Sequence, residues 1–332
     1  MQHIETIIIG GGPAGSSCAW QLQRNGHDVL ILDKARFPRE KLCAGWITAK
    51  VLHDLELTPA DYPHSILEIA IHTHIRYVPL TLRGSPNGTS NYSIRRFEFD
   101  NWLLQRSQAP VIRHQVKSIR NDGDHYIIDD LYSCKNLVGA GGTSCPVARL
   151  MFPGNRRKFR QVVTLEQEFK YPARDDNCHL YFGHYGTRGY AWYFPKGNGY
   201  LNVGIGGKAN HFKSTGISIH QHLDHFLRDL VKQEYLDKKT AAGFQKSGHP
   251  YYLISDHGKV KQNRCFLIGD AAGLATFDLG EGIGPAIESA LLTADEILGT
   301  GSYSKQAITK CSTTGLVGYL ARKFAAPKPL PS

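Results

Sequence analysis

The sequence contains no run of apolar residues that approaches the roughly 18 needed to span a membrane as a helix. Its seven cysteines form no Cys-x-x-Cys pair, and its 16 histidines form no His-x-x-x-His motif or other cluster with metal-ligand spacing. A Gly-x-Ser-x-Gly motif is also absent. These absences argue against a helical membrane protein, a disulfide framework, a metal site and a serine hydrolase. They favour a protein of the reducing cytoplasm.

The composition is that of a globular protein with a basic charge balance. Of the 332 residues, 41% are hydrophobic and 20% are charged, and the net charge is +10. Part of this charge lies in 156–160 and in 322–328. The excess predicts peripheral contact with an anionic lipid surface or with a phosphorylated substrate, and a solvated basic face is the alternative. Because aromatic residues do not interleave with these charges, we expect no nucleic-acid partner.

The N-terminus carries a dinucleotide-binding motif. The apolar run Ile7–Ile9 leads into Gly10-Gly11-Gly12-Pro13-Ala14-Gly15, and a helical stretch then leads to a second apolar run that ends at Asp33. Gly10 permits the sharp turn, Gly12 permits the backbone to approach a pyrophosphate, and Gly15 permits the helix to pack against the sheet. Asp33 has the spacing of a ribose acceptor. The pattern predicts a strand, a helix and a second strand that together bind a nucleotide.

Further along the chain, the pattern predicts a nucleotide-binding domain made of 1–66, 95–152 and 257–300. A β-rich domain of 67–94 and 153–256 is inserted into it, and 301–332 form a short C-terminal tail. Within these regions we expect a hairpin or meander over 66–94 with a turn at 84–88, paired strands at 190–195 and 201–206, and helices over 95–104, 220–234 and 285–298. Asp100 is expected to cap the helix over 95–104 or to lie in its first turn.

Two motifs together resemble a known enzyme class. The N-terminal glycine motif with the late Gly269-Asp270 is similar to FAD enzymes of the glutathione-reductase-like fold, in the branch of aromatic hydroxylases, flavin halogenases and geranylgeranyl reductases. Within that branch three stretches resemble the geranylgeranyl reductase family: 37–46 (FPREKLCAGW), 189–195 (GYAWYFP) with 202–204 (NVG), and 280–289 (GEGIGPAIES). The resemblance extends over most of 1–300.

This resemblance implies an α/β protein with a Rossmann-like FAD-binding domain and an inserted antiparallel β-sheet substrate domain. It implies that FAD is the cofactor and that Asp270 binds the ribityl chain. The expected activity is the reduction of carbon–carbon double bonds in a polyprenyl or other apolar substrate, with hydride from flavin N5. The residues expected to bind FAD are Gly10, Gly12, Pro13, Ala14, Gly15, Asp33, Lys34, Arg39, Cys43, Ala44, Gly45, Arg96, Gly141, Gly269, Asp270, Gly280, Gly282 and Ile283.

The resemblance also assigns a catalytic residue and a substrate pocket. Cys43 is implied as the proton donor beside the flavin, and a buried structural cysteine is the alternative. Tyr190, Trp192 and Phe194 alternate along a strand, so they share one face, while Tyr193 points to the other. They are predicted to line the substrate pocket near the flavin, and ordinary core residues are the alternative.

Three functions remain open from the sequence. The first is the reductase, which needs an external electron donor such as NADPH, ferredoxin or another reductant. The second is an FAD-dependent monooxygenase or halogenase, and the third is a non-catalytic electron-transfer flavoprotein. The family tends to have Cys-Gly-Gly where this chain has Cys43-Ala44-Gly45, and many hydroxylases carry Asp at the position of Gly141. The second difference argues against direct use of NADPH.

Overall fold

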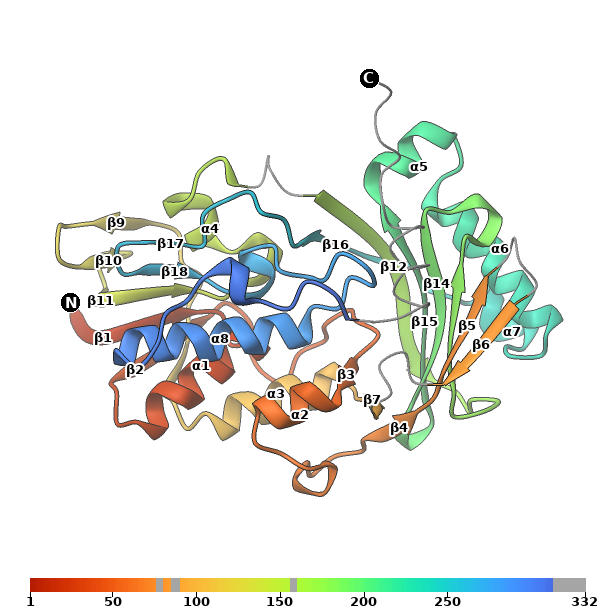
Figure 1. Cartoon of the computed structure of the whole chain (residues 1–332), viewed down its shortest axis with the longest axis horizontal. Helices are drawn as coiled ribbons and strands as arrows, with labels where there is room; N and C mark the ends of the chain where they lie inside the picture. The colour runs from red at the N-terminus through yellow and green to blue at the C-terminus, as the bar shows by residue number, and fades with distance from the viewer. Residues whose placement is uncertain (76–79, 85–89, 156–159, 313–332) are drawn as a thin grey trace.

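The computed structural model describes the chain except for 76–79, 85–89, 156–159 and 313–332 (Figure 1). Three predicted features therefore lie wholly or mostly outside the described residues: the turn at 84–88 apart from Gly84, most of the basic cluster at 156–160, and the basic segment at 322–328. The described chain forms three sheets, of which the two largest make up the two ends of an elongated molecule. No helix among the described residues is long and apolar enough to cross a membrane.

The N-terminal motif builds an eight-stranded sheet with a parallel centre. The strand order is β17-β18-β11-β1-β2-β8, with β10 and β9 added beside β11. Helix α1 connects the adjacent parallel strands β1 and β2 and packs against α3 and α8. The bounds are β1 (Gln2–Ile9), α1 (Pro13–Arg24), β2 (Val29–Asp33), α3 (Arg96–Arg106), β8 (Val111–Arg113), β9 (Ile119–Asn121), β10 (Tyr126–Ile128), β11 (Tyr132–Gly139), α4 (Pro146–Met151), β17 (Lys261–Gln262), β18 (Cys265–Leu267) and α8 (Ile283–Leu298).

A seven-stranded, largely antiparallel sheet forms the other end of the molecule, and a three-stranded sheet lies between the two. The order of the larger sheet is β16-β12-β15-β14-β13-β5-β6, and that of the smaller is β3-β7-β4. Their elements are β3 (Trp46–Thr48), α2 (Ala49–Asp54), β4 (Leu67–Ile69), β5 (Ile71–Ile75), β6 (Leu80–Gly84), β7 (Asn91–Ser93), β12 (Arg160–Lys170), β13 (Cys178–Phe182), β14 (Gly189–Lys196), β15 (Tyr200–Lys208), α5 (Ala209–Thr215), α6 (Ile219–Lys232), α7 (Lys238–Ala242) and β16 (Ser247–Leu253).

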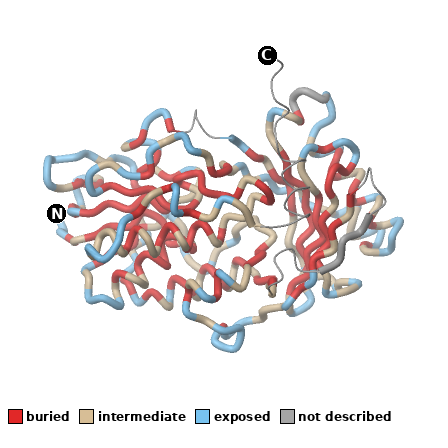
Figure 2. The backbone as a smooth tube through the Cα atoms, in the orientation of Figure 1, coloured by how far each residue is buried: buried red, intermediate tan, exposed pale blue. Residues whose placement is uncertain are grey.

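The two faces of β14 and β15 have different partners. Odd-numbered side chains such as Tyr193 and Val203 pack against Leu223, Phe226 and other apolar residues of α6. Even-numbered side chains such as Trp192 belong to a separate cluster on the opposite face. The predicted pairing of these strands and their alternation are confirmed. Figure 2 shows that the strands of both large sheets are mostly buried.

The structure corrects two local predictions. Asp100 does not cap α3, because the helix begins at Arg96 and Asp100 lies in its second turn, where its carboxylate accepts hydrogen bonds from Arg96 at 2.6 and 2.8 Å. The region 66–94 is also not one meander. Strands β5 and β6 pair as a hairpin within the seven-stranded sheet, whereas β4 and β7 pair with each other in the three-stranded sheet.

The glycines of the N-terminal motif have the packing roles that the sequence predicts. Gly10 has φ of +114°, and a Cβ atom there would lie 2.5 Å from the carbonyl oxygen of Ala140. A Cβ atom on Gly15 would overlap the carbonyl oxygen of Gly10, because α1 starts directly above the end of β1. A side chain at Gly15 would therefore force the first helix away from the sheet, and one at Gly10 would push the turn away from Ala140 and Gly141.

We expect Gly15→Ala to lower the free energy of unfolding by about 1–3 kcal/mol, since inserting a methyl group into a closely packed contact forces the backbone to shift. Urea unfolding followed by circular dichroism measures this change. Gly243→Ala is the matched control, because the nearest atom to its added Cβ is the Lys239 carbonyl oxygen at 3.5 Å. Equal stability of the two variants would contradict the packing argument.

Candidate active site

A cavity of about 800 Å³ lies between the two large sheets and brings the predicted residues together. Of the predicted FAD-binding residues, only Gly15 and Gly269 do not line it. Gly15 is packed on Gly10, and a Cβ atom on Gly269 would lie 3.1 Å from that of Ala14. The lining includes Gly10, Gly12, Pro13, Ala14, Asp33, Lys34, Arg39, Cys43, Ala44, Gly45, Arg96, Gly141, Asp270, Gly280, Gly282, Ile283, Tyr190, Trp192 and Phe194.

The N-terminus of α1 forms the end of the cavity that suits a diphosphate. The helix has Gly12 at its N-cap, no side-chain cap and no acidic residue in its first turn, so its amide dipoles are open to an anion. Asp33 stands beside it at the end of β2. Its carboxylate accepts hydrogen bonds from the amides of Gly11 and Ala35, each at 2.7 Å. These contacts fix the turn and hold the Asp33 carboxylate at the cavity.

Two acidic residues meet at the N-terminus of α8. A Cβ atom on Gly282 would lie 3.4 Å from Oδ1 of Asp270, so this carboxylate stands directly beside the start of the helix. The Glu281 carboxylate accepts a hydrogen bond from the Gly284 amide at 2.6 Å, and burial raises the pKa of Glu281 to about 7. The sequence analysis did not assign Glu281 a role. Its carboxylate occupies part of the N-terminus of α8.

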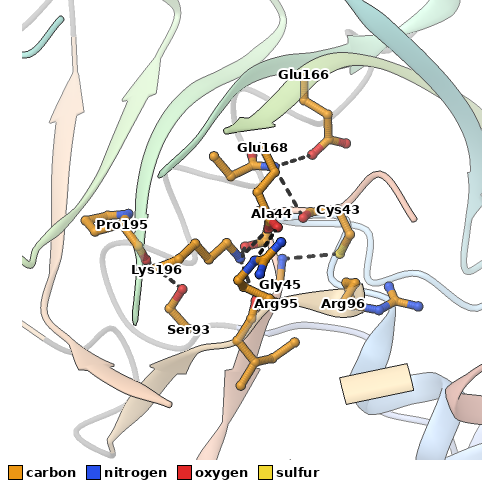
Figure 3. Close-up of polar contacts among 12 residues, drawn as sticks. Cys43, Ala44, Gly45, Ser93, Arg95, Arg96, Glu166, Glu168, Pro195 and Lys196 are labelled. Atoms are coloured by element: carbon orange, nitrogen blue, oxygen red, sulfur yellow. Dashed lines mark hydrogen bonds and ion pairs between the residues drawn. The ribbon is translucent and has the colours of Figure 1, made fainter. Parts of the chain in front are cut away.

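Backbone contacts hold the loop of Cys43 in place (Figure 3). The Gly45 amide donates to Sγ of Cys43 at 3.3 Å, and Nδ2 of Asn202 donates to the Cys43 carbonyl oxygen at 3.4 Å. Lys196 donates from Nζ to the carbonyl oxygens of Ala44 and, at 2.7 Å, Ile94. The loop that bears the thiol is thereby tied to the seven-stranded sheet.

Lys196 is a functional candidate that the sequence analysis missed. Its side chain is fully buried and lies 3.9 Å from the Glu168 carboxylate. Burial lowers the pKa of this amine, and Glu168 opposes that effect. Gly45 has φ of +68°, and a Cβ atom there would collide with Nζ of Lys196 and the Ile94 carbonyl oxygen. The only signal in the sequence is that Lys196 directly follows the 189–195 stretch.

A buried guanidinium lies next to Cys43. Burial by itself would lower the pKa of Arg96, but its interactions with Asp100 and Cys43 raise that pKa above its ordinary value. Asp100 also pairs with Arg39 at 3.3 Å. The Arg96 charge is therefore held in place by α3 and stands beside the sulfur.

The aromatic residues expected to line the pocket form one wall of the cavity and are also part of the core. Trp192 is 5% exposed and Phe194 is 1% exposed, and both pack with Leu180 and Phe182. Nε1 of Trp192 donates to Asn202 Oδ1 at 2.6 Å. Trp192 and Phe194 therefore belong to the hydrophobic core and also line the cavity.

A buried acid lies beside this wall. Glu166 is 3% exposed, lines the cavity and accepts a hydrogen bond from Nδ2 of Asn202 at 3.1 Å. Burial raises its pKa to about 7. Lys41 and His249 meet nearby with their side-chain nitrogens 2.6 Å apart, and burial of both groups lowers their pKa values. Sequence reasoning missed Glu166 because a single acid in a strand ordinarily faces solvent.

Comparisons with known proteins agree with this architecture. Residues 161–243 match the family model of the geranylgeranyl reductase catalytic domain, and residues 8–68 match that of an NAD(P)-binding Rossmann-like domain. The chain is 25% identical to digeranylgeranylglycerophospholipid reductase 3 of Methanosphaera stadtmanae, over 98% of this chain and 85% of that protein. It is 26% identical to menaquinone reductase of Mycobacterium tuberculosis, over 88% of this chain and 76% of that protein.

The crystal structure of a geranylgeranyl bacteriochlorophyll reductase-like protein from Thermoplasma acidophilum has the same fold. The TM-score is 0.76 at 20% identity, over 97% of this chain and 84% of that chain. The predicted fold class, a Rossmann-like FAD-binding domain with an added antiparallel sheet, is confirmed. The predicted resemblance to geranylgeranyl reductases is confirmed as well, and it implies a flavin cofactor.

Burial of Glu166 predicts a pH-dependent stability. Its pKa of about 7 in the folded chain exceeds the unfolded value near 4.5, so unfolding releases this proton and the contribution of Glu166 to stability falls as pH rises from about 4.5 to about 7. Glu166→Gln cannot ionise. The stability of this variant relative to wild type should therefore rise by up to about 3 kcal/mol across that window.

Chemical denaturation at a series of pH values between 4.5 and 8 measures this difference. The exposed Glu40→Gln is the control, and its stability relative to wild type should stay constant across the series. A constant difference for Glu166→Gln as well would show that the carboxyl group has the same pKa in the folded and unfolded chains.

Proposed function

We propose, from its resemblance to geranylgeranyl reductases, that this chain binds FAD and reduces carbon–carbon double bonds in an apolar isoprenoid substrate. The observation that carries the proposal is that one cavity is lined by the dinucleotide turn, by Asp270, by Cys43 and by an aromatic wall. Two relatives are named for reductions of a digeranylgeranylglycerophospholipid and of menaquinone, which supports a substrate with an isoprenoid chain.

The donor and acceptor groups at the cavity fit FAD. The open N-terminus of α1 would receive the diphosphate, Asp33 would accept from the adenosine ribose, and Asp270 would accept from the ribityl chain. Bound FAD supplies hydride to the substrate once an external donor such as NADPH or ferredoxin has reduced it. The protein's own residues then need to position the double bond, supply a proton and exclude water.

Cys43 is proposed as the proton donor. Its thiol lies on the cavity surface, and the contacts of its loop with Gly45, Asn202 and Lys196 hold it in one position. After the proton has moved to carbon, the sulfur would carry a negative charge, and the Arg96 guanidinium beside it would stabilise that charge. Trp192 and Phe194 would hold the apolar chain against the sheet and exclude water.

The substrate and the charge of the protein also support contact with a membrane surface. An isoprenoid lipid resides in a bilayer, so the enzyme must collect it there. The net charge of +10 would favour peripheral binding at an anionic surface.

We expect the purified chain to bind FAD noncovalently, and Asp270→Ala to weaken that binding roughly ten- to a hundredfold, because a charge-assisted hydrogen bond is lost. Quenching of FAD fluorescence on titration with apoprotein measures the affinity. The control is Asp256→Ala, since this exposed residue does not line the cavity. A folded wild-type protein that takes up no FAD would overturn the proposed function.

With dithionite-reduced enzyme and no oxygen, a geranylgeranyl substrate should gain hydrogen. Cys43→Ala should reduce that rate on the order of 100- to 10,000-fold while retaining FAD, as expected for a missing general acid. Product mass and single-turnover rates provide the measurement, and Cys311→Ala is the control because Cys311 does not line the cavity. Turnover that requires O2 and gives a hydroxylated or halogenated product would favour the alternative enzymes, and full activity of Cys43→Ala would remove the assigned role.

A further inference from the structure

Three cations meet at one end of the seven-stranded sheet, on the face that borders the cavity. Gly189 pairs with Gly207 at the end of the antiparallel β14–β15 ladder, and Arg188 and Lys208 are the next residues on the two chains. On the other side of β15, Lys208 pairs with Val162 of β12, and Arg160 is two residues from Val162. Since side chains two apart on a strand share a face, the register brings Arg160 and Lys208 to one face of β12 and β15. Arg188, directly before β14, lines the same cavity as Lys208, and both arginines are close enough to act on the pKa of Lys208.

This cluster has no counter-charge within the part of the chain that the structure describes. None of the three side chains makes an ion pair with a described carboxylate, and Arg160 and Arg188 are exposed. Burial lowers the pKa of Lys208 to about 8, and repulsion from Arg160 and Arg188 adds to that effect. Like charges directly opposite in a sheet are destabilising. A bound anion would remove this repulsion.

Along the cavity-facing side of β14 and β15, the cations are followed by aromatic side chains and then by the polar Asn202. Arg188 and Lys208 line the cavity at its exposed end, and the next even-numbered positions of β14 are Tyr190 and the buried Trp192. Asn202, which is hydrogen-bonded to the Cys43 carbonyl oxygen, lies six residues before Lys208 on β15. At 3.4 Å per residue, about 20 Å separate the cations from the loop of Cys43. In Figure 1 the cationic end of these strands lies beside α5, and the opposite end lies beside β7.

We propose that Arg160, Arg188 and Lys208 bind the phosphate-bearing head of an amphiphilic substrate whose apolar chain runs along the aromatic wall to Cys43. The assignment of the reacting bond rests on the proposed function, whereas the phosphate subsite does not. An ionised phosphate offers several acceptor oxygens to two guanidinium groups and an ammonium group, so it can bridge all three strands. The site thus selects isoprenoids with an anionic head over neutral ones of the same chain length.

The test uses FAD-loaded enzyme in its oxidised form, so that binding is measured without turnover. Geranylgeranyl phosphate and geranylgeraniol are titrated separately, and the change in flavin absorbance or tryptophan fluorescence gives each affinity. Wild type should bind the phosphate at least about tenfold more tightly than the alcohol. Lys208→Gln and Arg188→Gln should each remove roughly tenfold of the phosphate affinity and leave the alcohol unchanged, as expected for a lost charge-assisted contact. Lys208→Arg should retain it.

The control is Lys170→Gln, an exposed cation at the other end of β12, which should change neither affinity. Equal affinities of the phosphate and the alcohol, or equal losses for both ligands in the two Gln variants, would overturn the proposal. Two further titrations identify other sources of the anion. In one outcome, Lys208→Gln weakens the binding of inorganic phosphate or NADPH but not that of geranylgeranyl phosphate. This result would assign the cations to a free anion or to the reductant, and it would overturn the lipid-head assignment.

The two proposals can fail separately. Selective binding of geranylgeranyl phosphate by an enzyme that never reduces it would retain the subsite and refute the reductase. Reduction of geranylgeranyl chains without any dependence on the head group would retain the reductase and refute the phosphate subsite.

Discussion

The buried amine of Lys196 connects the parts of the molecule on which the candidate site depends. One ammonium group donates to the carbonyl oxygens of Ala44 and Ile94 and lies beside Glu168. Those carbonyl groups belong to the loop that carries Cys43 and to the segment between β7 and α3, while Lys196 itself ends β14. A buried charge is tolerated only when its donors are satisfied, so this contact strongly specifies how the sheet meets the loop. Gly45 is required here because any side chain would occupy the place of Nζ.

The seven-stranded sheet serves two purposes because its strands alternate. The face that carries Tyr193 and Val203 is covered by α6 and supplies the hydrophobic stability of that end of the molecule. The opposite face can therefore border a cavity and carry side chains that are chosen for chemistry, such as Glu166 and Lys208. A shift of one residue in the register of β15 would exchange the two sets. The nine-residue pairing of β12 with β15 and the eight-residue pairing of β14 with β15 protect against such a slip.

Local patterns in the sequence were sufficient where a residue acts on its chain neighbours or through a motif. Gly10, Gly15 and the alternation around Trp192 are of this kind, and the structure agrees with the packing expected for each. Asp100 was misplaced because its partner Arg96 lies inside the same helix, where a buried ion pair outweighs the preference of Asp for helix termini. Glu166, Glu281 and Lys196 were not assigned because their roles depend on burial and on strand register, and neither is encoded in a short stretch of sequence.

The two ends of the cavity differ in the charge of the side chains that lie there. At its inner end, the carboxyl groups of Glu166 and Glu281 have pKa values near 7, so near neutral pH they are partly protonated and carry less negative charge than exposed acids would. The nearby amines of Lys41 and Lys196 also have lowered pKa values, because burial disfavours their charged forms. An apolar chain can enter such a region at a lower desolvation cost than a charged head can. At the outer end, Arg188 is exposed to solvent. If the cationic cluster binds a phosphate as proposed, a ligand with one charged end and one apolar end would lie with its chain directed toward Cys43.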